Sequence, residues 1–209
     1  MRRILLLAHR VPVSGEFTLN DLAGGAGRMD EIARAVSTAF TLSNDLRRDT
    51  EVTVLFVAEP PPRARRITIH GARVRYLNPD ERSTAAPLKN ALVRSQEFPR
   101  EFESSPGLTV AAVDPAAAMV GFLGQPNPIW LTESGSPLEE WSPVQTDVSA
   151  VISDPYDPDP SEVAVLERSG VPRISIGPRS VRCSQVVDAL HRELDVREAG
   201  LRRRPEGSP

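Results

Sequence analysis

The sequence predicts an α/β fold in which helices flank a mostly parallel sheet. Residues 3–8 and 51–57 are short apolar runs, and a helical pattern at residues 29–40 separates them, which is the strand–helix–strand unit of parallel sheets. Three further apolar runs, at residues 129–131, 149–152 and 173–176, each end in a polar or proline-rich loop. With 209 residues and 40% hydrophobic content, the chain fits one domain over residues 1–196 and a short tail.

The first half supplies two strands, a small hairpin and two helices. The helix over residues 29–40 is predicted by an apolar stripe at Met29, Ile32, Ala33, Val36, Ala39 and Phe40. Residues 67–69 and 74–77, separated by Gly71, predict a hairpin. Asn78 as cap, Pro79 at the first helical position and Glu81 predict the start of another helix. Pro87 predicts that this helix breaks and restarts toward Leu92.

The second half alternates short strands and helices. The pattern predicts a turn at residues 104–107, a strand at 108–113 and a helix at 115–123. It also predicts a helix at 161–169 that Gly170 ends. A last helix follows from the apolar stripe of Val186, Val187, Leu190 and Leu194. The segment 197–209 is rich in charge and proline with little to bury, and we expect it to be disordered.

Composition excludes several classes of protein. There is no apolar run near 20 residues, so we expect no membrane association and a cytoplasmic location. The single cysteine, Cys183, excludes an internal disulfide framework. The three histidines and Cys183 lack zinc-ligand spacing, and we expect no metal. A net charge of −3 argues against a broad nonspecific nucleic-acid binder.

Polar signatures bracket the helix at residues 29–40. Before it stands Gly24-Gly25-Ala26-Gly27-Arg28-Met29-Asp30, and after it Asn44-Asp45-Leu46-Arg47-Arg48-Asp49. A glycine-rich turn lets the backbone approach a ligand closely, and the helix start that follows offers N–H groups to an anion. The same turn is compatible with a flexible surface loop and an ordinary capping acid.

These signatures resemble a known family. Over residues 19–55 the chain is similar, nearly position by position, to the archaeal tRNA pseudouridine N1-methyltransferases, a branch of the SPOUT superfamily of RNA methyltransferases. The similarity is carried by Asp21-Leu22, Gly27-Arg28-Met29-Asp30, Ala39-Phe40, Leu42-Ser43 and Asp45-Leu46-Arg47-Arg48-Asp49. Asn78-Pro79-Asp80-Glu81-Arg82 and Arg173-Ile174-Ser175-Ile176-Gly177-Pro178 resemble two further motifs of the family.

The resemblance implies a fold, a reaction and partners. It implies a SPOUT-type α/β knot with a C-terminal trefoil knot, and a homodimer whose active site lies at the interface. It also implies methylation of N1 of pseudouridine at position 54, in the T-loop of tRNA, with S-adenosyl-L-methionine as cofactor. A divergent SPOUT paralogue with weakened or lost catalysis, acting in RNA binding or assembly, is the alternative. An unrelated α/β enzyme with a phosphate-bearing cofactor lacks support, because neither GxGxxG nor a P-loop is present.

The reaction needs a group that removes the N1 proton and cations that hold RNA. Asp30, beside Arg28, is the first candidate for a base or base-orienting group, followed by Asp49 and Asp80. Each carboxylate could instead cap a helix or pair with a neighbouring arginine. Three further arginines, Arg47, Arg48 and Arg82, are candidates for RNA contact.

The cofactor site is expected beyond the carboxyl ends of the later strands, where ligands bind in open α/β sheets. This places residues 132–135, 153–155 and 177–179 together. The resemblance assigns donor binding to Leu131, Ser153, Ile174, Ser175, Ile176, Gly177, Pro178, Arg179 and Val186. Ser153 stands where the family usually has glycine, and prolines follow at 155, 158 and 160. Cys183 does not align with the family cysteine, which falls at Val186, and we expect a small core or helix-start residue.

Overall fold

One eight-stranded mixed sheet runs through the part of the chain that the computed structural model describes, residues 1–57, 64–75, 77–98, 100–141 and 147–200. The strand order is β4-β5-β3-β2-β1-β7-β6-β8. The strands are β1 (Arg2–Ala8), β2 (Thr50–Val57), β3 (Ala64–His70), β4 (Phe102–Ser105), β5 (Leu108–Val113), β6 (Pro128–Pro137), β7 (Val148–Ser153) and β8 (Arg173–Ser175). In this spatial order, the strands β2, β1, β7, β6 and β8 are parallel to one another. Strand β3 is antiparallel to its neighbours β2 and β5, and β5 is antiparallel to β4.

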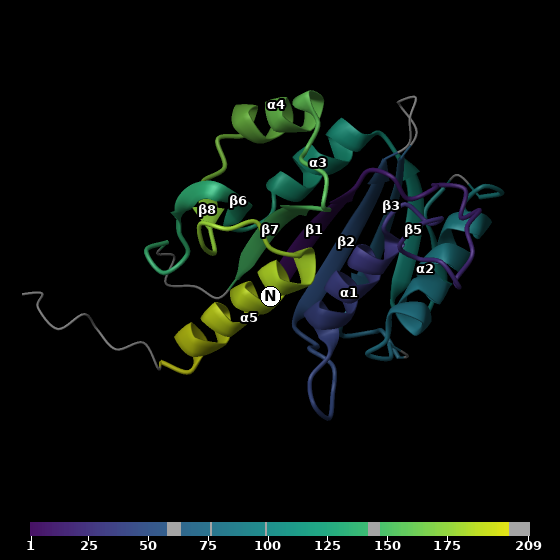
Figure 1. Ribbon diagram of the computed structural model, residues 1–209, viewed down its shortest axis with the longest axis horizontal. Coiled ribbons are helices and arrows are strands. Elements are labelled where there is room, and N and C mark those ends of the chain that lie inside the picture. The colour runs from purple at the N-terminus through teal and green to yellow at the C-terminus, as the bar shows by residue number, and fades with distance from the viewer. Residues whose placement is uncertain (58–63, 76, 99, 142–146, 201–209) are drawn as a thin grey trace, which may run out of the picture.

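Helices cover both faces of this sheet (Figure 1). They are α1 (Met29–Phe40), α2 (Glu81–Arg94), α3 (Pro115–Leu123), α4 (Pro160–Arg168) and α5 (Cys183–Glu198). Alternate residues of β1 supply the two cores, because successive side chains of a strand point to opposite faces. Ile4 and Leu6 pack in the core under α1, α2 and α5, and Leu5 and Leu7 in the core under α3 and α4. The predicted α/β fold with helices flanking the sheet is confirmed.

Helix α1 lies in the centre of one face and contacts both α2 and α5. The predicted range, residues 29–40, is confirmed, and its apolar stripe is buried. Arg28 precedes the helix in the left-handed conformation, with φ 67°, and Gly27 before it has φ 61°. This turn brings the start of α1 to the carboxyl end of β1.

The predicted hairpin of residues 67–69 with 74–77 is wrong. Strand β3 instead pairs antiparallel with β2 on one side and with β5 on the other. After β3 the chain turns out of the sheet, because the backbone N–H of Val74 donates to the carbonyl of His70 at 2.8 Å. A hairpin does form between β4 and β5, around a turn at Pro106 and Gly107, where φ of Gly107 is 78°. Strand β4 therefore occupies part of the turn that we predicted at 104–107. Residue 76, which belonged to the predicted hairpin, lies outside the described residues.

Helix α2 begins later than expected and is not interrupted. Asp80, and not Asn78, caps it, because its carboxylate accepts a hydrogen bond from the Ser83 amide at 2.8 Å. The predicted break at Pro87 is wrong, since the helix continues to Arg94. A proline at this position removes one backbone hydrogen bond, to the carbonyl of Ser83. The burial of apolar residues on either side of it, including Leu88, against α1 outweighs that loss.

At the C-terminal end, α5 reaches Glu198. The segment that we expected to be disordered therefore overlaps the helix by two residues, and residues 201–209 lie outside the described residues. Arg197 is ordered because its side chain donates hydrogen bonds to Glu193 and to the carbonyl of Leu138, each at 2.7 Å. The domain boundary at residue 196 stays a prediction. None of the described helices combines the length and hydropathy required to cross a bilayer.

Candidate functional site

A pocket of about 680 Å³ opens where β7 and β8 end beside the middle of β6. Six of the nine predicted cofactor residues line it: Leu131, Ser153, Ile176, Gly177, Arg179 and Val186. The other three lie next to it. Ile174 is buried in β8 and pairs with Leu131, and Ser175 fixes the following turn through hydrogen bonds with the N–H and carbonyl of Gly177. Pro178 belongs to the same exposed turn.

The segment 132–135 differs from the prediction, because it continues β6 instead of forming a loop. The pairing of β6 with β8 shifts register between Leu131 and Ser136. Thr132 and Glu133 line the pocket, whereas Ser134 and Gly135 line a separate hollow.

The proline-containing segment after β7 forms one wall of the pocket. Pro155 and Pro158 are among the residues that line it. Ser153 donates a hydrogen bond from its hydroxyl to the carbonyl of Tyr156 at 2.6 Å, which closes a tight turn. Cys183, the first residue of α5, donates to the carbonyl of Ser153 at 3.1 Å. Burial, with a smaller contribution from nearby carboxylates, raises the pKa of this thiol to about 12, and Cys183 is unsuited to act as a nucleophile.

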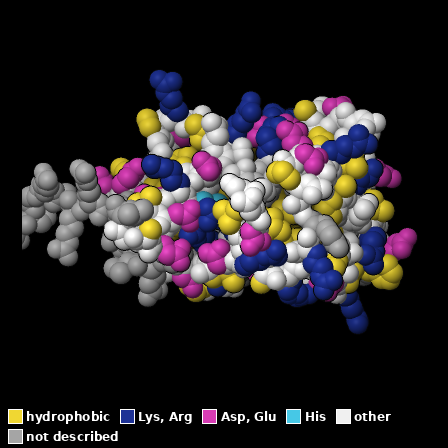
Figure 2. Space-filling model, turned by 90° about the horizontal axis from the view of Figure 1, so that it is seen from below, with side chains coloured by type: hydrophobic (Ala, Val, Ile, Leu, Met, Phe, Trp, Pro, Cys, Tyr) yellow, Lys and Arg dark blue, Asp and Glu magenta, His cyan; other side chains and the backbone are white. Residues whose placement is uncertain are grey.

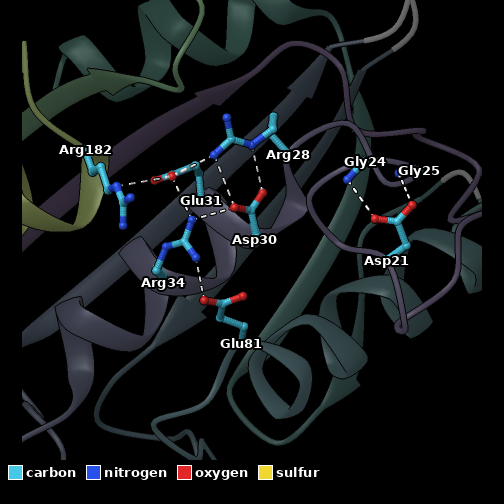
Figure 3. A network of polar contacts seen from close by, with 9 residues as sticks. All are labelled: Asp21, Gly24, Gly25, Arg28, Asp30, Glu31, Arg34, Glu81 and Arg182. Atoms are coloured by element: carbon cyan, nitrogen blue, oxygen red, sulfur yellow. Dashed lines mark hydrogen bonds and ion pairs between the residues drawn. The ribbon is translucent and has the colours of Figure 1, made fainter.

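A network of ion pairs faces the pocket from the first turns of α1 (Figure 3). Arg28 donates to both carboxylate oxygens of Asp30, at 3.0 and 3.2 Å, and to Glu31 at 2.8 Å. Arg34 donates to the same two acids and to Glu81 at the start of α2. Burial alone would raise the pKa of Asp30, but the hydrogen bonds from both arginines outweigh it and lower the pKa. Arg28 and Glu31 line the pocket, and Asp30 contacts Arg28 without being one of the lining residues.

The amides of Gly24, Gly25 and the first turn of α1, which we expected to be free for an anion, already have hydrogen-bond partners. The N–H groups of Gly24 and Gly25 donate to the carboxylate of Asp21, at 2.8 and 2.7 Å (Figure 3). The first three amides of α1, those of Met29, Asp30 and Glu31, donate to backbone carbonyls. Gly27 is required for packing, because a Cβ there would lie 1.9 Å from the carbonyl oxygen of Arg10. These paired amides give no support to a phosphate-bearing cofactor at this turn.

Asp49 is not brought to this pocket within one chain. It precedes β2, and its carbonyl accepts a hydrogen bond from the amide of Arg2 at the amino end of β1. Its carboxylate lies 3.4 Å from Nε of Arg2. The 12 residues of α1 separate this end of the sheet from Asp30, a length of roughly 18 Å.

The three candidate RNA-binding arginines lie in two places. Arg47 and Arg48 stand near Asp49, and Arg82 is exposed in the first turn of α2. Arg47 donates two hydrogen bonds to Asp195 of α5, at 2.9 and 2.6 Å. Arg48 donates to the carbonyls of Gly71 and Val74 and borders an open hollow. The lower face of the molecule carries acidic and basic side chains side by side, and no purely basic surface is visible on it (Figure 2).

His9, which follows the carboxyl end of β1, was missed by the sequence analysis as a site residue. Its ring nitrogens lie 2.8 Å from Asp154 and 2.8 Å from Glu162. Burial alone would lower the pKa of His9, but hydrogen bonds to both carboxylates raise it to about 10. A signal was present, since a polar side chain directly after a buried strand was the criterion that selected residues 153–155.

Comparison with known proteins gives the context for this pocket. Residues 1–199 match a family model described as "Putative SAM-dependent RNA methyltransferase". The chain belongs to this family. The resemblance that the motifs of residues 19–55 and 173–178 indicated is thereby confirmed.

Named relatives of this SAM-dependent RNA methyltransferase family match over nearly their whole length. The tRNA (pseudouridine(54)-N(1))-methyltransferase of Methanocella arvoryzae is 38% identical over 94% of this chain and 100% of its own. The proteins of that name from Methanosarcina mazei and Haloarcula marismortui are 35% and 33% identical, over 100% and 97% of this chain and 97% and 100% of theirs.

A solved structure shares the fold. The crystal structure of Archaeoglobus fulgidus Nep1 bound to S-adenosylhomocysteine superposes with a TM-score of 0.60 at 15% identity. The alignment covers 95% of this chain and 98% of that one. At this identity the likeness shows a shared fold.

Proposed function

We propose that the chain methylates N1 of pseudouridine 54 in the T-loop of tRNA, with S-adenosyl-L-methionine as methyl donor. The observation that carries this function is full-length similarity, at 33–38% identity, to three archaeal enzymes with this name. The pocket supports the proposal, because strand ends from β7 and β8 and the start of α1 meet around one cavity.

The residues of the pocket fit a cationic donor. Leu131, Ile176 and Val186 offer apolar surface to an adenosine group, and several acidic side chains line the same cavity, including Asp154 and Glu31. Glu31 has a buried carboxylate oxygen, Oε2, for which the described structure shows no hydrogen-bond partner. A buried unpaired acceptor is costly, and a donor group on a bound ligand would satisfy it. The bound cofactor supplies an activated methyl group on a sulfonium.

For donor binding we assign the nine residues that the sequence indicated, in two roles. Leu131, Ser153, Ile176, Gly177, Arg179 and Val186 contact the donor from the pocket walls. Ile174, Ser175 and Pro178 hold the β8 turn in shape. The alternative, a divergent paralogue that binds RNA without catalysis, draws on Ser153, whose side chain stands where the family usually has glycine.

In the reaction, we assign Asp30 to orient Arg28. The lowered pKa of Asp30 makes it a weak base, and its three hydrogen bonds from Arg28 and Arg34 fix the direction of the Arg28 guanidinium. Arg28 lines the pocket and would position the target base or its phosphate. Asp49 would take part only if a second subunit brought it to the pocket.

For RNA contact we assign Arg48 and Arg82, whose side chains are exposed. Arg47, which is held by Asp195, would supply RNA contact only by giving up that pair. We also propose a homodimer with the pocket at its interface and a C-terminal trefoil knot, both of which the family resemblance implies, and a cytoplasmic location, which fits a tRNA substrate. Light scattering of the purified protein tests the dimer.

Calorimetry with S-adenosyl-L-methionine separates the two functions at low cost. Micromolar binding supports the methyltransferase. An absence of detectable binding, in a sample that is folded by circular dichroism, supports the paralogue that has lost donor binding.

A further inference from the structure

The imidazole of His9 joins three segments that are far apart in sequence. His9 follows β1, while Asp154 follows β7 and Glu162 lies in the first turn of α4. The His9 amide also donates to Asp154, at 2.8 Å, so both the backbone and the ring hold that carboxylate. The ring is 14% exposed, and its two partner carboxylates are almost completely buried.

Both carboxylates organise the backbone around them. Asp154 also accepts a hydrogen bond from the Tyr156 amide at 3.0 Å, and its own amide donates to the carbonyl of Leu7 at 2.9 Å. Glu162 accepts from the amide of Asp159 at 2.9 Å, as one half of the capping box of α4. A change at His9 therefore reaches the turn at residues 153–156 and the start of α4 together.

The geometry requires a charged ring. An imidazolium can donate from both nitrogens at once, whereas a neutral imidazole has one donor and one acceptor. In the neutral form one nitrogen lone pair would face a carboxylate, and one of the two contacts would be lost. The charged groups that face or adjoin His9 are Asp154, Asp159, Glu162 and its neighbour Arg10, three acids against one base.

We propose that His9 is a positioning residue for the methyl donor. The imidazolium of His9 holds residues 153–158 in place, and these residues form one wall of the pocket. His9 acts through that wall, which includes Asp154, Pro155 and Pro158. The inference rests on the proposed function, because it assigns a donor to this pocket.

The first test measures donor affinity by calorimetry in His9→Phe and His9→Asn. His9→Phe keeps the ring volume and removes both contacts, while His9→Asn keeps a short donor for Asp154 only. We expect the Kd for S-adenosyl-L-methionine to rise at least about tenfold in His9→Phe, less in His9→Asn, with tRNA affinity unchanged. The matched control is His70→Asn, since His70 pairs with Glu51 at the β2–β3 pair, away from the pocket. Unchanged donor affinity in His9→Phe would overturn the proposal.

The second test uses Glu162→Gln, which keeps the side-chain shape and removes one anionic partner of His9. In the wild type we expect donor affinity to be constant between pH 6 and pH 9, since the His9 pKa is raised to about 10. In Glu162→Gln the His9 pKa falls, and donor affinity should decline within that range. A purely structural role would lower thermal stability without creating this pH dependence, and a flat profile contradicts the proposal.

A third readout does not need the donor at all. Hydrogen exchange of the Asp154 and Tyr156 amides should become faster in His9→Phe and Glu162→Gln and stay unchanged in His70→Asn. If the wild-type protein does not bind the donor but the variants show this exchange pattern, the proposed function is contradicted. His9 would still be the residue that holds the wall. Normal donor binding with unchanged exchange in the variants would sink the role of His9.

Discussion

Arg28 holds the carboxylate of Asp30 with two hydrogen bonds, from Nε at 3.0 Å and from Nη2 at 3.2 Å. The pair stands where the glycine turn enters α1, with the Arg28 backbone in the left-handed conformation. A two-point contact of this kind fixes the plane of a guanidinium as well as its position. The relationship gives Asp30 a role without requiring it to accept a proton.

Asp30→Asn should reduce methyl transfer at least about a hundredfold, because an amide cannot accept the full set of hydrogen bonds from Arg28 and Arg34. Affinity for tRNA should stay near that of the wild type. Single-turnover kinetics and a filter-binding assay check the two parts. The control is Glu81→Gln, which removes only the negative charge of the outer partner of Arg34. Near-normal turnover in Asp30→Asn would remove this residue from the mechanism.

Gly27→Ala should destabilise the protein by at least about 2 kcal/mol, since φ is 61° and the added Cβ would overlap the Arg10 carbonyl. The comparison is Gly121→Ala in α3, where nothing lies within 4 Å of the new methyl group. Alanine there should stabilise the helix by up to about 1 kcal/mol. Urea unfolding measures the stability of both variants. Equal unfolding midpoints for Gly27→Ala and the wild type would show that the turn tolerates a side chain.

His191 should make stability depend on pH in the acidic range. Burial, and then the charges of Arg47 and Arg2, lower its pKa to about 4 from an ordinary value of 6.5. As pH falls, His191 therefore binds a proton in the unfolded chain before it does so in the folded protein. The stability that neutral His191 contributes is complete above pH 6.5 and is lost as the pH falls to 4. The free energy of unfolding should fall by about 3 kcal/mol over that window.

Urea unfolding at pH 7 and pH 4.5 measures the effect, and His191→Gln supplies the reference because glutamine does not titrate. The variant should lose less stability than the wild type on acidification. Parallel losses in the two proteins would assign the acid sensitivity to other groups.

Cys183 should react slowly with iodoacetamide in the folded protein. The pKa of the thiol is raised to about 12, so the reactive thiolate is scarce, and the side chain is buried. At pH 8 the native labelling rate should be roughly a thousandfold below that in urea. Mass spectrometry over time gives both rates, and complete labelling of the native protein within minutes would disagree with the burial of this residue.

Local sequence patterns predicted the parts of the fold whose structure depends on which neighbouring residues are buried. Helix α1 followed from one apolar stripe, and the pocket followed from the rule that parallel strands end at one edge of a sheet. The hairpin was wrong because the second partner of β3 is β5, which lies after a further helix in the chain. No local pattern specifies that pairing.

The position of the pocket followed from the sequence, and the contacts around it did not. The side chain of Asp21 occupies the glycine amides, and His9 reaches Glu162 across 153 residues of sequence. Asp49 was the second candidate carboxylate after Asp30, but the two residues flank one helix, which puts its ends at opposite ends of the sheet. The function itself came from the family resemblance and from relatives that match over the full length.

The most direct test incubates the wild-type protein with labelled S-adenosyl-L-methionine and two tRNA samples, one with pseudouridine at position 54 and one with uridine there. Nuclease digestion and mass spectrometry then locate the methyl group. We expect methylation of N1 of pseudouridine 54 in the first sample and none in the second. Transfer to another nucleotide, or no transfer to either tRNA by a protein that binds the donor, would contradict the function assigned to this pocket.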